Sequence, residues 1–303
     1  MALVLLKRIF IMFAFMAIGC ILYKRKLVSD QGTKTMGNVL LYIVVPAVII
    51  KSFNIPSSPD ITSKMLISFA AGGACMALSM IIAWLVFRKN PMENFSAAFF
   101  NSGFLGVPLV AYVLGEDSVI YVVALVFLIG FLQWTYGVYI ITKDKKNIAP
   151  KKIIFNPSLI GLVLGLIVYF MPFDLPALIT TGINDMAAMN APLAMLILGA
   201  YFAQTDVKKF FTDKQAYLVC LIRLVITPLA TLALLSVLPR SLNSIRLAVL
   251  INVITPVGSN APIFGQLFDK DYVSSTRYVS LSTILCIISM PLVILLANLL
   301  WVK

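Results

Sequence analysis

The chain has 303 residues, of which 61% are hydrophobic and only 12% are charged, and its net charge is +12. A soluble domain usually carries about a quarter charged residues, so this composition excludes a water-exposed globular protein. The Lys and Arg residues lie in short connectors between apolar runs, where they set membrane topology, and this placement excludes a nucleic-acid partner.

Long apolar runs follow one another along the chain, and each must be helical because lipid offers no hydrogen bonds to an open backbone. The first run is expected to be a transmembrane helix and not a cleaved lipoprotein signal, since the residues after Cys20 stay apolar through Tyr23. The sequence therefore predicts an all-α polytopic membrane protein. Its ten predicted spans cover residues 3–23, 36–53, 64–87, 95–115, 118–142, 156–172, 180–203, 215–238, 246–268 and 274–301.

The distribution of basic residues predicts the orientation in the membrane. Sixteen Lys and Arg residues lie in the connectors after spans 1, 3, 5, 7 and 9, and seven lie on the opposite side. Cytoplasmic connectors carry the excess of Lys and Arg, so both termini are predicted to lie outside. We expect the protein in the plasma membrane of a bacterial cell.

The most hydrophilic connector, "KDKKNIAPKK" (143–152), lies at the midpoint of the chain. It divides a five-span half (1–142) from a second five-span half (156–303), with a basic cytoplasmic linker (143–155) between them. An odd number of spans in each half gives the halves opposite orientations, as in the inverted repeats of secondary transporters. A shift of 154 positions places Pro108 on Pro262, in support of this repeat.

Spans 4 and 9 both carry helix-breaking residues, in "NSGFLGVPLV" (101–110) and "TPVGSNAPIF" (255–264). We expect half-helices that end near Asn101 and Thr255 and restart near Gly106–Val107 and Asn260–Ala261. Two opposed helix starts would expose N–H groups at the bilayer centre and bind an anion, whereas the alternative is a pair of kinks used for close packing. The candidate substrate-binding residues are Asn101, Ser102, Gly103, Gly106, Pro108, Thr255, Pro256, Gly258, Ser259, Asn260 and Pro262.

These motifs carry a family resemblance. "NSGFLGVPL" resembles the fourth-helix motif of the auxin efflux carrier family, and "TPVGSNAPIFGQLF" resembles its ninth-helix crossover, in which Pro256 opens the break and Pro262 follows. The resemblance covers essentially the whole chain, and the missing central loop is typical of a prokaryotic member. Related families of the bile acid/sodium symporter-like superfamily share the crossed-helix fold.

The resemblance implies a scaffold of spans 1, 2, 6 and 7 and a mobile transport domain of spans 3–5 and 8–10. The transport domain would carry the crossover site across the membrane in an elevator mechanism. Prokaryotic members are usually assigned to organic acids such as malate or malonate. Asn190 is a candidate residue on the scaffold side of the cavity. A homodimer through the scaffold helices is left open.

Arg223 is the one basic residue deep within a span. A buried cation needs a partner, so Arg223 either contacts a substrate carboxylate or bonds helix carbonyls. The two breaks contain no Asp or Glu, and coupling to Na⁺ or H⁺ is left open.

The sequence thus predicts a secondary carrier of small organic anions, with a sodium-coupled symporter and an anion channel as alternatives. The absence of His excludes His-ligated metals, and the four cysteines are too widely spaced for a metal site. A membrane-embedded enzyme would need clustered catalytic groups. We therefore predict no enzyme and no cofactor.

Overall fold

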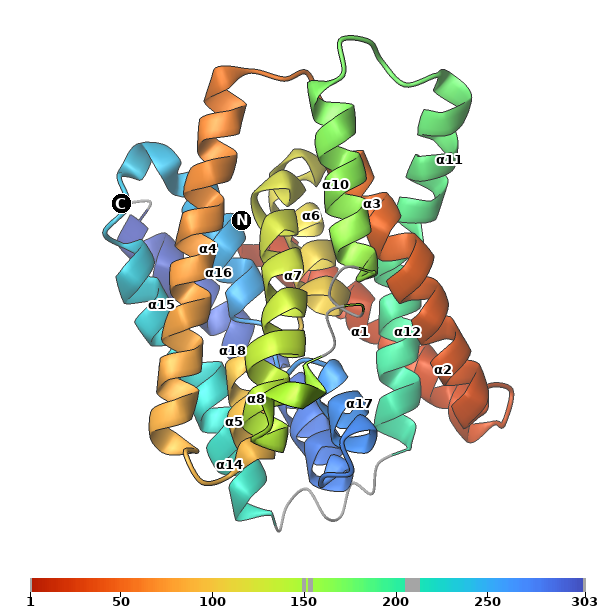
Figure 1. Ribbon diagram of the computed structural model, residues 1–303, viewed down its shortest axis with the longest axis vertical. Helices are drawn as coiled ribbons and strands as arrows, with labels where there is room; N and C mark the ends of the chain where they lie inside the picture. Colours follow the sequence, from red (N-terminus) through yellow and green to blue (C-terminus); the bar gives the residue numbers. More distant parts are fainter. Residues whose placement is uncertain (1, 149–150, 152–154, 205–212, 302–303) are drawn as a thin grey trace.

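The computed structural model describes residues 2–148, 151, 155–204 and 213–301, with side chains from residue 10 onward. These residues form helices and no strand (Figure 1). The α-helices are α1 (Ala2–Lys24), α2 (Asp30–Val39), α3 (Val45–Phe53), α4 (Pro59–Val86), α5 (Pro91–Ala98), α6 (Val107–Leu114), α7 (Ile120–Leu132), α8 (Val138–Thr142), α10 (Pro157–Phe170), α11 (Ala177–Ala188), α12 (Asn190–Ala203), α14 (Lys214–Leu221), α15 (Thr227–Leu235), α16 (Asn243–Val253), α17 (Asn260–Leu267) and α18 (Tyr272–Trp301).

Short 3₁₀ turns, which are tighter than an α-helix, and short π turns, which are wider, join several of these elements. The π-helical turns are η1 (Leu40–Val44), η2 (Ser102–Gly106), η4 (Gln133–Gly137) and η6 (Ile222–Ile226), and the 3₁₀ turns are η3 (Glu116–Val119), η5 (Lys145–Asn147) and η7 (Arg240–Leu242).

Six continuous helical stretches are long and apolar enough to cross a bilayer, and this confirms a polytopic helical membrane protein. They are Asp30–Phe53, Pro59–Val86, Glu116–Thr142, Ala177–Ala203, Lys214–Leu235 and Tyr272–Trp301. Three further apolar helices are shorter, Phe10–Lys24, Ser102–Leu114 and Pro157–Phe170. The count of ten spans and the inverted repeat remain predictions.

Helix starts follow from local capping residues. The second span begins at Asp30 and not at residue 36 as predicted, because the Ser29 hydroxyl accepts a hydrogen bond from the Gly32 amide at 3.1 Å. The first turns of this helix are polar, so no apolar periodicity in the sequence indicated that the helix begins at Asp30. Ser58 caps α4 and Asn156 caps α10 in the same way.

Three of the four π-helical turns lie directly before a proline. Pro46, Pro108 and Pro228 each follow the last residue of a π turn by two positions. A proline has no N–H and its ring crowds the carbonyl of the preceding turn, so a widened turn relieves the clash without ending the helix. Span 2, the second half of span 4 and span 8 therefore continue through their prolines.

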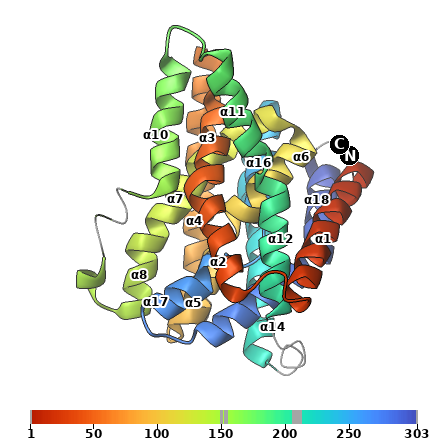
Figure 2. The same ribbon diagram turned by 90° about the vertical axis from the view of Figure 1, so that its right-hand side faces the viewer.

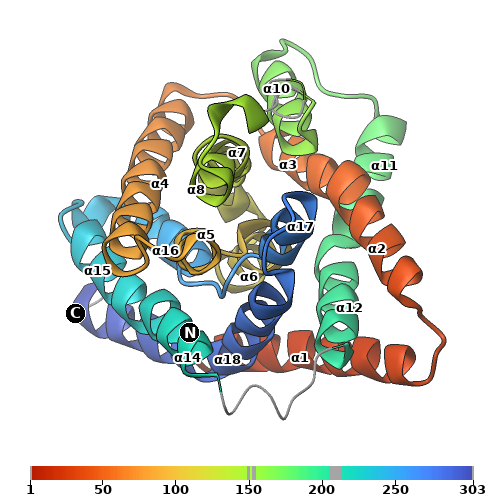
Figure 3. The ribbon, with the colours of Figure 1, turned by 60° about the horizontal axis from the view of Figure 1, so that its bottom comes forward.

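One group of helices lies on one side of the molecule (Figure 3). In this group α1 packs against α12, and α3 packs against α10 and α11. The α1–α12 contact is close, because a Cβ on Gly19 would lie 2.1 Å from the Leu196 carbonyl oxygen and one on Gly199 would lie 1.9 Å from that of Met16. Such glycine contacts are how membrane helices approach backbone to backbone.

The other helices form a second group around α5, α6, α16 and α17, which Figure 3 shows in the middle of the molecule. Here α4 packs against α5 and α7, and α18 packs against α14 and α17. Figures 1 and 2 place the start of α1 and the end of α18 at a similar height along the long axis. The broken helices thus belong to the second group and lie in the middle of the molecule.

Candidate functional site

The two broken helices cross through their unwound segments, residues 99–101 and 254–259, which we call the crossover. The segments run antiparallel and share two backbone hydrogen bonds of 2.9 Å, from the Asn101 amide to the Pro256 carbonyl and from the Gly258 amide to the Phe99 carbonyl. A Cβ on Gly258 would lie 3.2 Å from the Phe99 carbonyl oxygen, so glycine allows the close approach. The crossing thereby satisfies backbone groups that lipid could not.

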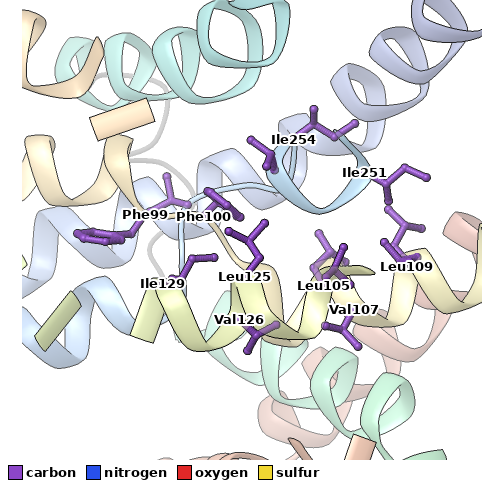
Figure 4. Close-up of a cluster of buried hydrophobic side chains, with 14 of the residues drawn as sticks. Phe99, Phe100, Leu105, Val107, Leu109, Leu125, Val126, Ile129, Ile251 and Ile254 are labelled. Atoms are coloured by element: carbon purple, nitrogen blue, oxygen red, sulfur yellow. The ribbon is translucent and has the colours of Figure 1, made fainter. Parts of the chain in front are cut away.

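The crossover is embedded in apolar side chains. Figure 4 shows Phe99 and Phe100 of one segment and Ile254 of the other, together with neighbours from η2, α6, α7 and α16. These neighbours are fully or almost fully buried and include Leu105, Val107, Leu109, Leu125, Val126, Ile129 and Ile251. Since they hold both segments from several helices, the crossover is a packed structural unit.

Both half-helices restart at the crossover. In span 4 the α-helix restarts at Val107, as expected. The π turn η2 extends this helix back to Ser102, because the Leu105 and Gly106 amides donate to the Asn101 carbonyl. The second half of span 9 restarts at Asn260, as expected. Since the first amides of a helix have no acceptor within it, the crossover presents two helix starts.

The side chains at the two helix starts are joined to one another and to neighbouring helices. Asn101 Nδ2 donates to Ser259 Oγ at 3.0 Å, and Asn260 Nδ2 donates to Gln133 Oε1 of η4 at 3.0 Å. Each amide nitrogen carries a second N–H. The Asn101 and Asn260 side chains are therefore oriented and still have donor capacity.

A cavity of about 580 Å³ lies against this arrangement. Its walls come from η1 and α3, from the crossover, from α7 and η4, and from the start of α10. Lys151 is the single charged residue among the described lining residues, which include no carboxylate. The cavity contains polar and apolar surface in one small volume, which suits a small organic ligand.

The structure brings together six of the predicted residues in the cavity wall, namely Asn101, Ser102, Gly103, Gly258, Ser259 and Asn260. The other crossover residues support these from behind. Thr255 is fully buried and its hydroxyl donates to the Asn252 carbonyl at 2.8 Å. Gly106, Pro108 and Pro256 are buried and Pro262 is half-buried, and none of the four lines the cavity.

Gly106 has a specific packing role. A Cβ there would lie 2.6 Å from Asn252 Nδ2. This side chain on α16 accepts a hydrogen bond from the Ser102 hydroxyl at 2.7 Å. The glycine therefore lets the first turn of the restarted helix dock against the opposite broken helix.

Arg223 and Asn190 lie outside the described lining of the cavity. Arg223 is fully buried and donates hydrogen bonds to the backbone carbonyls of Ala97 and Val253. These contacts match the carbonyl-bonding alternative of the two that the sequence left open. Asn190 is buried at the start of α12, a helix that packs against η2.

Several lining residues were not among the predicted ones. Gln133 and Trp134 lie in the middle of span 5, and Asn156, Ser158 and Lys151 lie at or before the start of span 6. An amide in an apolar span was a usable signal for Gln133. The others reach the cavity through the packing of the two helix groups, for which the sequence carries no local signal.

The fold and the cavity define a polytopic membrane protein with a ligand-sized cavity beside two broken helices. Comparison with known families agrees with this class. The sequence matches the family described as "Membrane transport protein" over residues 4–294. The chain belongs to this family, which confirms the resemblance to the auxin efflux carriers, and it is a membrane transporter and not an enzyme.

Known relatives are similar over most of the chain. An "Uncharacterized transporter" of Methanothermobacter thermautotrophicus is 26% identical over 289 residues, which is 91% of this chain and 92% of the relative. An "Uncharacterized transporter" of Methanocaldococcus jannaschii is 22% identical, over 87% of this chain and 90% of the relative. A "Putative malonate transporter" of Rhizobium meliloti is 22% identical, over 59% of this chain and 62% of the relative.

Proposed function

We propose that this protein is a secondary carrier of small organic anions, and that the anion binds at the crossover. The observation that carries this proposal is the cavity wall. It combines two helix starts, the amide side chains of Asn101 and Asn260 and the cation Lys151, with no carboxylate among its described residues. Each of these groups donates hydrogen bonds, and a carboxylate is a ligand that only accepts them.

The electrostatics of the helix starts support the same ligand class. The start of a helix carries about half a positive charge, which favours an anion. Ser102 and Asn260 begin the two restarted helices, and both line the cavity. Such a site binds a carboxylate in the low-dielectric interior without a buried lysine, because the backbone supplies the positive potential.

The cavity size and the relatives narrow the choice of ligand for testing. About 580 Å³ accommodates a molecule of a few carbon atoms with its hydration water. One relative is described as a "Putative malonate transporter". We therefore propose small carboxylates, with malonate and malate as the first candidates.

We further propose ten spans in two inverted five-span halves, and an elevator movement. The scaffold would consist of spans 1, 2, 6 and 7, and the transport domain of spans 3–5 and 8–10. This division is supported by the packing of α1 against α12 and of α3 against α10 and α11, which is more extensive than the packing of these helices against α6, α7 and α18. The cavity lies between the two groups, as alternating access requires.

The proposed orientation places both termini outside a bacterial plasma membrane. The basic linker and the start of α10 would then face the cytoplasm. Lys151 and Asn156 line the cavity at this end. The structure would therefore correspond to a state whose cavity opens towards the cytoplasm.

A thermal-shift screen tests the ligand class. Purified protein is heated with mono- and dicarboxylates and with matched amines and neutral diols. A carboxylate present at 100 times its Kd should stabilise the folded protein by about 2.7 kcal/mol, because it binds the folded form only. Stabilisation by amines or diols, with none by any carboxylate, would contradict the proposed function.

A further inference from the structure

Arg223 is a buried charge without a buried counter-ion. Its side chain is 0% exposed, and none of the ion pairs among the described residues involves it. A guanidinium keeps its charge in a protein, and moving that charge out of water is costly. Its surroundings must therefore supply the compensating negative potential.

That potential comes from the ends of the two broken helices. Arg223 Nη1 donates to the Ala97 carbonyl at 3.4 Å, in the last turn of α5. Its Nη2 donates to the carbonyl of Val253, the last residue of α16. The end of a helix carries about half a negative charge, so two such ends together match one guanidinium.

Neighbouring groups fix the geometry of this contact. Ser79 of α4 accepts a hydrogen bond from Arg223 Nη1 at 2.9 Å and donates one to the Ala98 carbonyl at 2.8 Å. The guanidinium carbon also lies 5.0 Å from the centre of the Phe100 ring. Phe100 belongs to the crossover and lines the cavity. Arg223 is thus connected to both broken helices immediately next to their unwound segments.

The element that carries Arg223 also favours this geometry. Arg223 lies in the π-helical turn η6, just before Pro228. A π turn widens the helix and redirects its side chains, and such turns are frequent at functional sites.

From these contacts we infer that Arg223 is a positioning residue of the transporter. It joins the C-terminal ends of α5 and α16 and neutralises their dipoles, so that the crossover keeps its register and the opposed helix starts keep a net positive potential. It acts without touching the substrate. The electrostatic part of this role rests on the proposed function, whereas the positional part does not.

Hydrogen exchange measured by mass spectrometry tests the positional part. The variants are Arg223→Gln, which removes the positive charge, and Arg223→Lys, which keeps the positive charge on a shorter side chain. Arg246→Gln is the matched control. Arg246 is 3% exposed, lies on α16 and stacks on Trp301 at 4.3 Å. The readout is exchange of the Asn101 and Gly258 amides, which bond across the crossover.

In Arg223→Gln, peptides that contain these two amides should exchange about tenfold faster or more, because charged hydrogen bonds that hold both helix ends are lost. Peptides from the α1–α12 contact should be unchanged. Arg223→Lys should show a smaller increase, and Arg246→Gln should leave the crossover as in the wild type.

Two results would overturn the inference. One is unchanged exchange at the crossover in Arg223→Gln. The other is a uniform increase over the whole chain, which would show a merely structural role in overall stability.

A malonate thermal shift on the same variants tests the electrostatic part. Arg223→Gln should weaken malonate binding about tenfold or more, and Arg223→Lys should restore most of it. If the wild type responds to no carboxylate, the proposed function fails while the exchange result still decides the positional role. If the wild type responds and Arg223→Gln binds malonate as tightly, the electrostatic role is wrong.

Discussion

The two faces of the crossover differ in chemistry. The cavity face, made by Asn101, Ser102, Ser259 and Asn260, presents helix starts and donor groups to an open volume. The rear face, made by Ala97, Val253, Ser79 and Arg223, is fully buried and presents helix ends to the Arg223 cation. The same pair of breaks thus places helix starts, whose partial charge favours an anion, on one side and helix ends, whose partial charge favours a cation, on the other. Residues of the cavity face should affect transport, and residues of the rear face should affect the integrity of the crossover.

The largest expected effect is on the cavity face. The double variant Asn101→Ala, Asn260→Ala removes two donors that would bond a carboxylate, each worth about 1.5–3 kcal/mol. Carboxylate uptake into proteoliposomes should fall by more than about 100-fold in the double variant. Uptake by each single variant should fall by about tenfold or more. The melting temperature without ligand should stay near that of the wild type.

Asn298→Ala is the control for this pair. It removes a half-buried amide from α18, away from the cavity lining. Normal uptake by both single asparagine variants would show that the crossover is not the binding site.

A smaller effect is expected where the two faces meet. In Gly258→Ala the new Cβ would lie 3.2 and 3.3 Å from the Phe99 and Phe100 carbonyl oxygens and push the crossing segments apart. Overpacking of this kind costs about 1–3 kcal/mol, so both uptake and melting temperature should fall. Gly182→Ala is the matched control, because a Cβ there meets nothing within 4 Å. If Gly258→Ala behaves like Gly182→Ala, the close crossing of the segments is not needed.

A variant that supports the crossover from outside the cavity lining should separate stability from transport. The Ser282 hydroxyl accepts a hydrogen bond from the Val257 amide at 3.1 Å. Ser282→Ala leaves that buried amide unpaired and should lower the free energy of unfolding by about 1–3 kcal/mol. Uptake at a permissive temperature should change little. Ser289→Ala on the same helix should be neutral, since the Ser289 hydroxyl has no partner among the described residues. Lost uptake in a stable Ser282→Ala protein would contradict the division into two faces.

The smallest effect concerns Lys151. This lysine is exposed and lines the cavity. An exposed charge contributes up to about 1 kcal/mol, so Lys151→Met should weaken dicarboxylate affinity by up to about fivefold and monocarboxylate affinity less. The difference should shrink at high salt, because ions screen exposed charges. If Lys151→Met lowers the affinity for dicarboxylates and monocarboxylates equally, Lys151 does not bind a second carboxylate.

The sequence predicted the cavity face better than the rear face for a physical reason. Pro, Gly and Asn mark a broken helix in the sequence, so the breaks shortly before Pro108 and Pro262 could be located in advance. Two partners of Arg223 are backbone carbonyls, which every residue carries, so no sequence pattern could identify them. Gln133 and Asn156 reach the cavity wall because of how the two helix groups pack. Local sequence patterns do not predict this packing.

Helix boundaries show the same limit. The start of the second span was predicted too late because its first turns are polar, and only the Ser29 cap defines its position. The restart at Ser102 depends on which amides reach the Asn101 carbonyl, a detail of the π turn before Pro108. Proline position predicted that a break exists, and the backbone geometry decided where the new helix begins.

A cryo-electron microscopy structure with bound malonate tests the central claim most directly. We expect density for the ligand within hydrogen-bond distance of the Asn101 and Asn260 side chains, at the starts of the helices that begin with Ser102 and Asn260. Density confined to another part of the protein, with both asparagines unoccupied at saturating malonate, would contradict it.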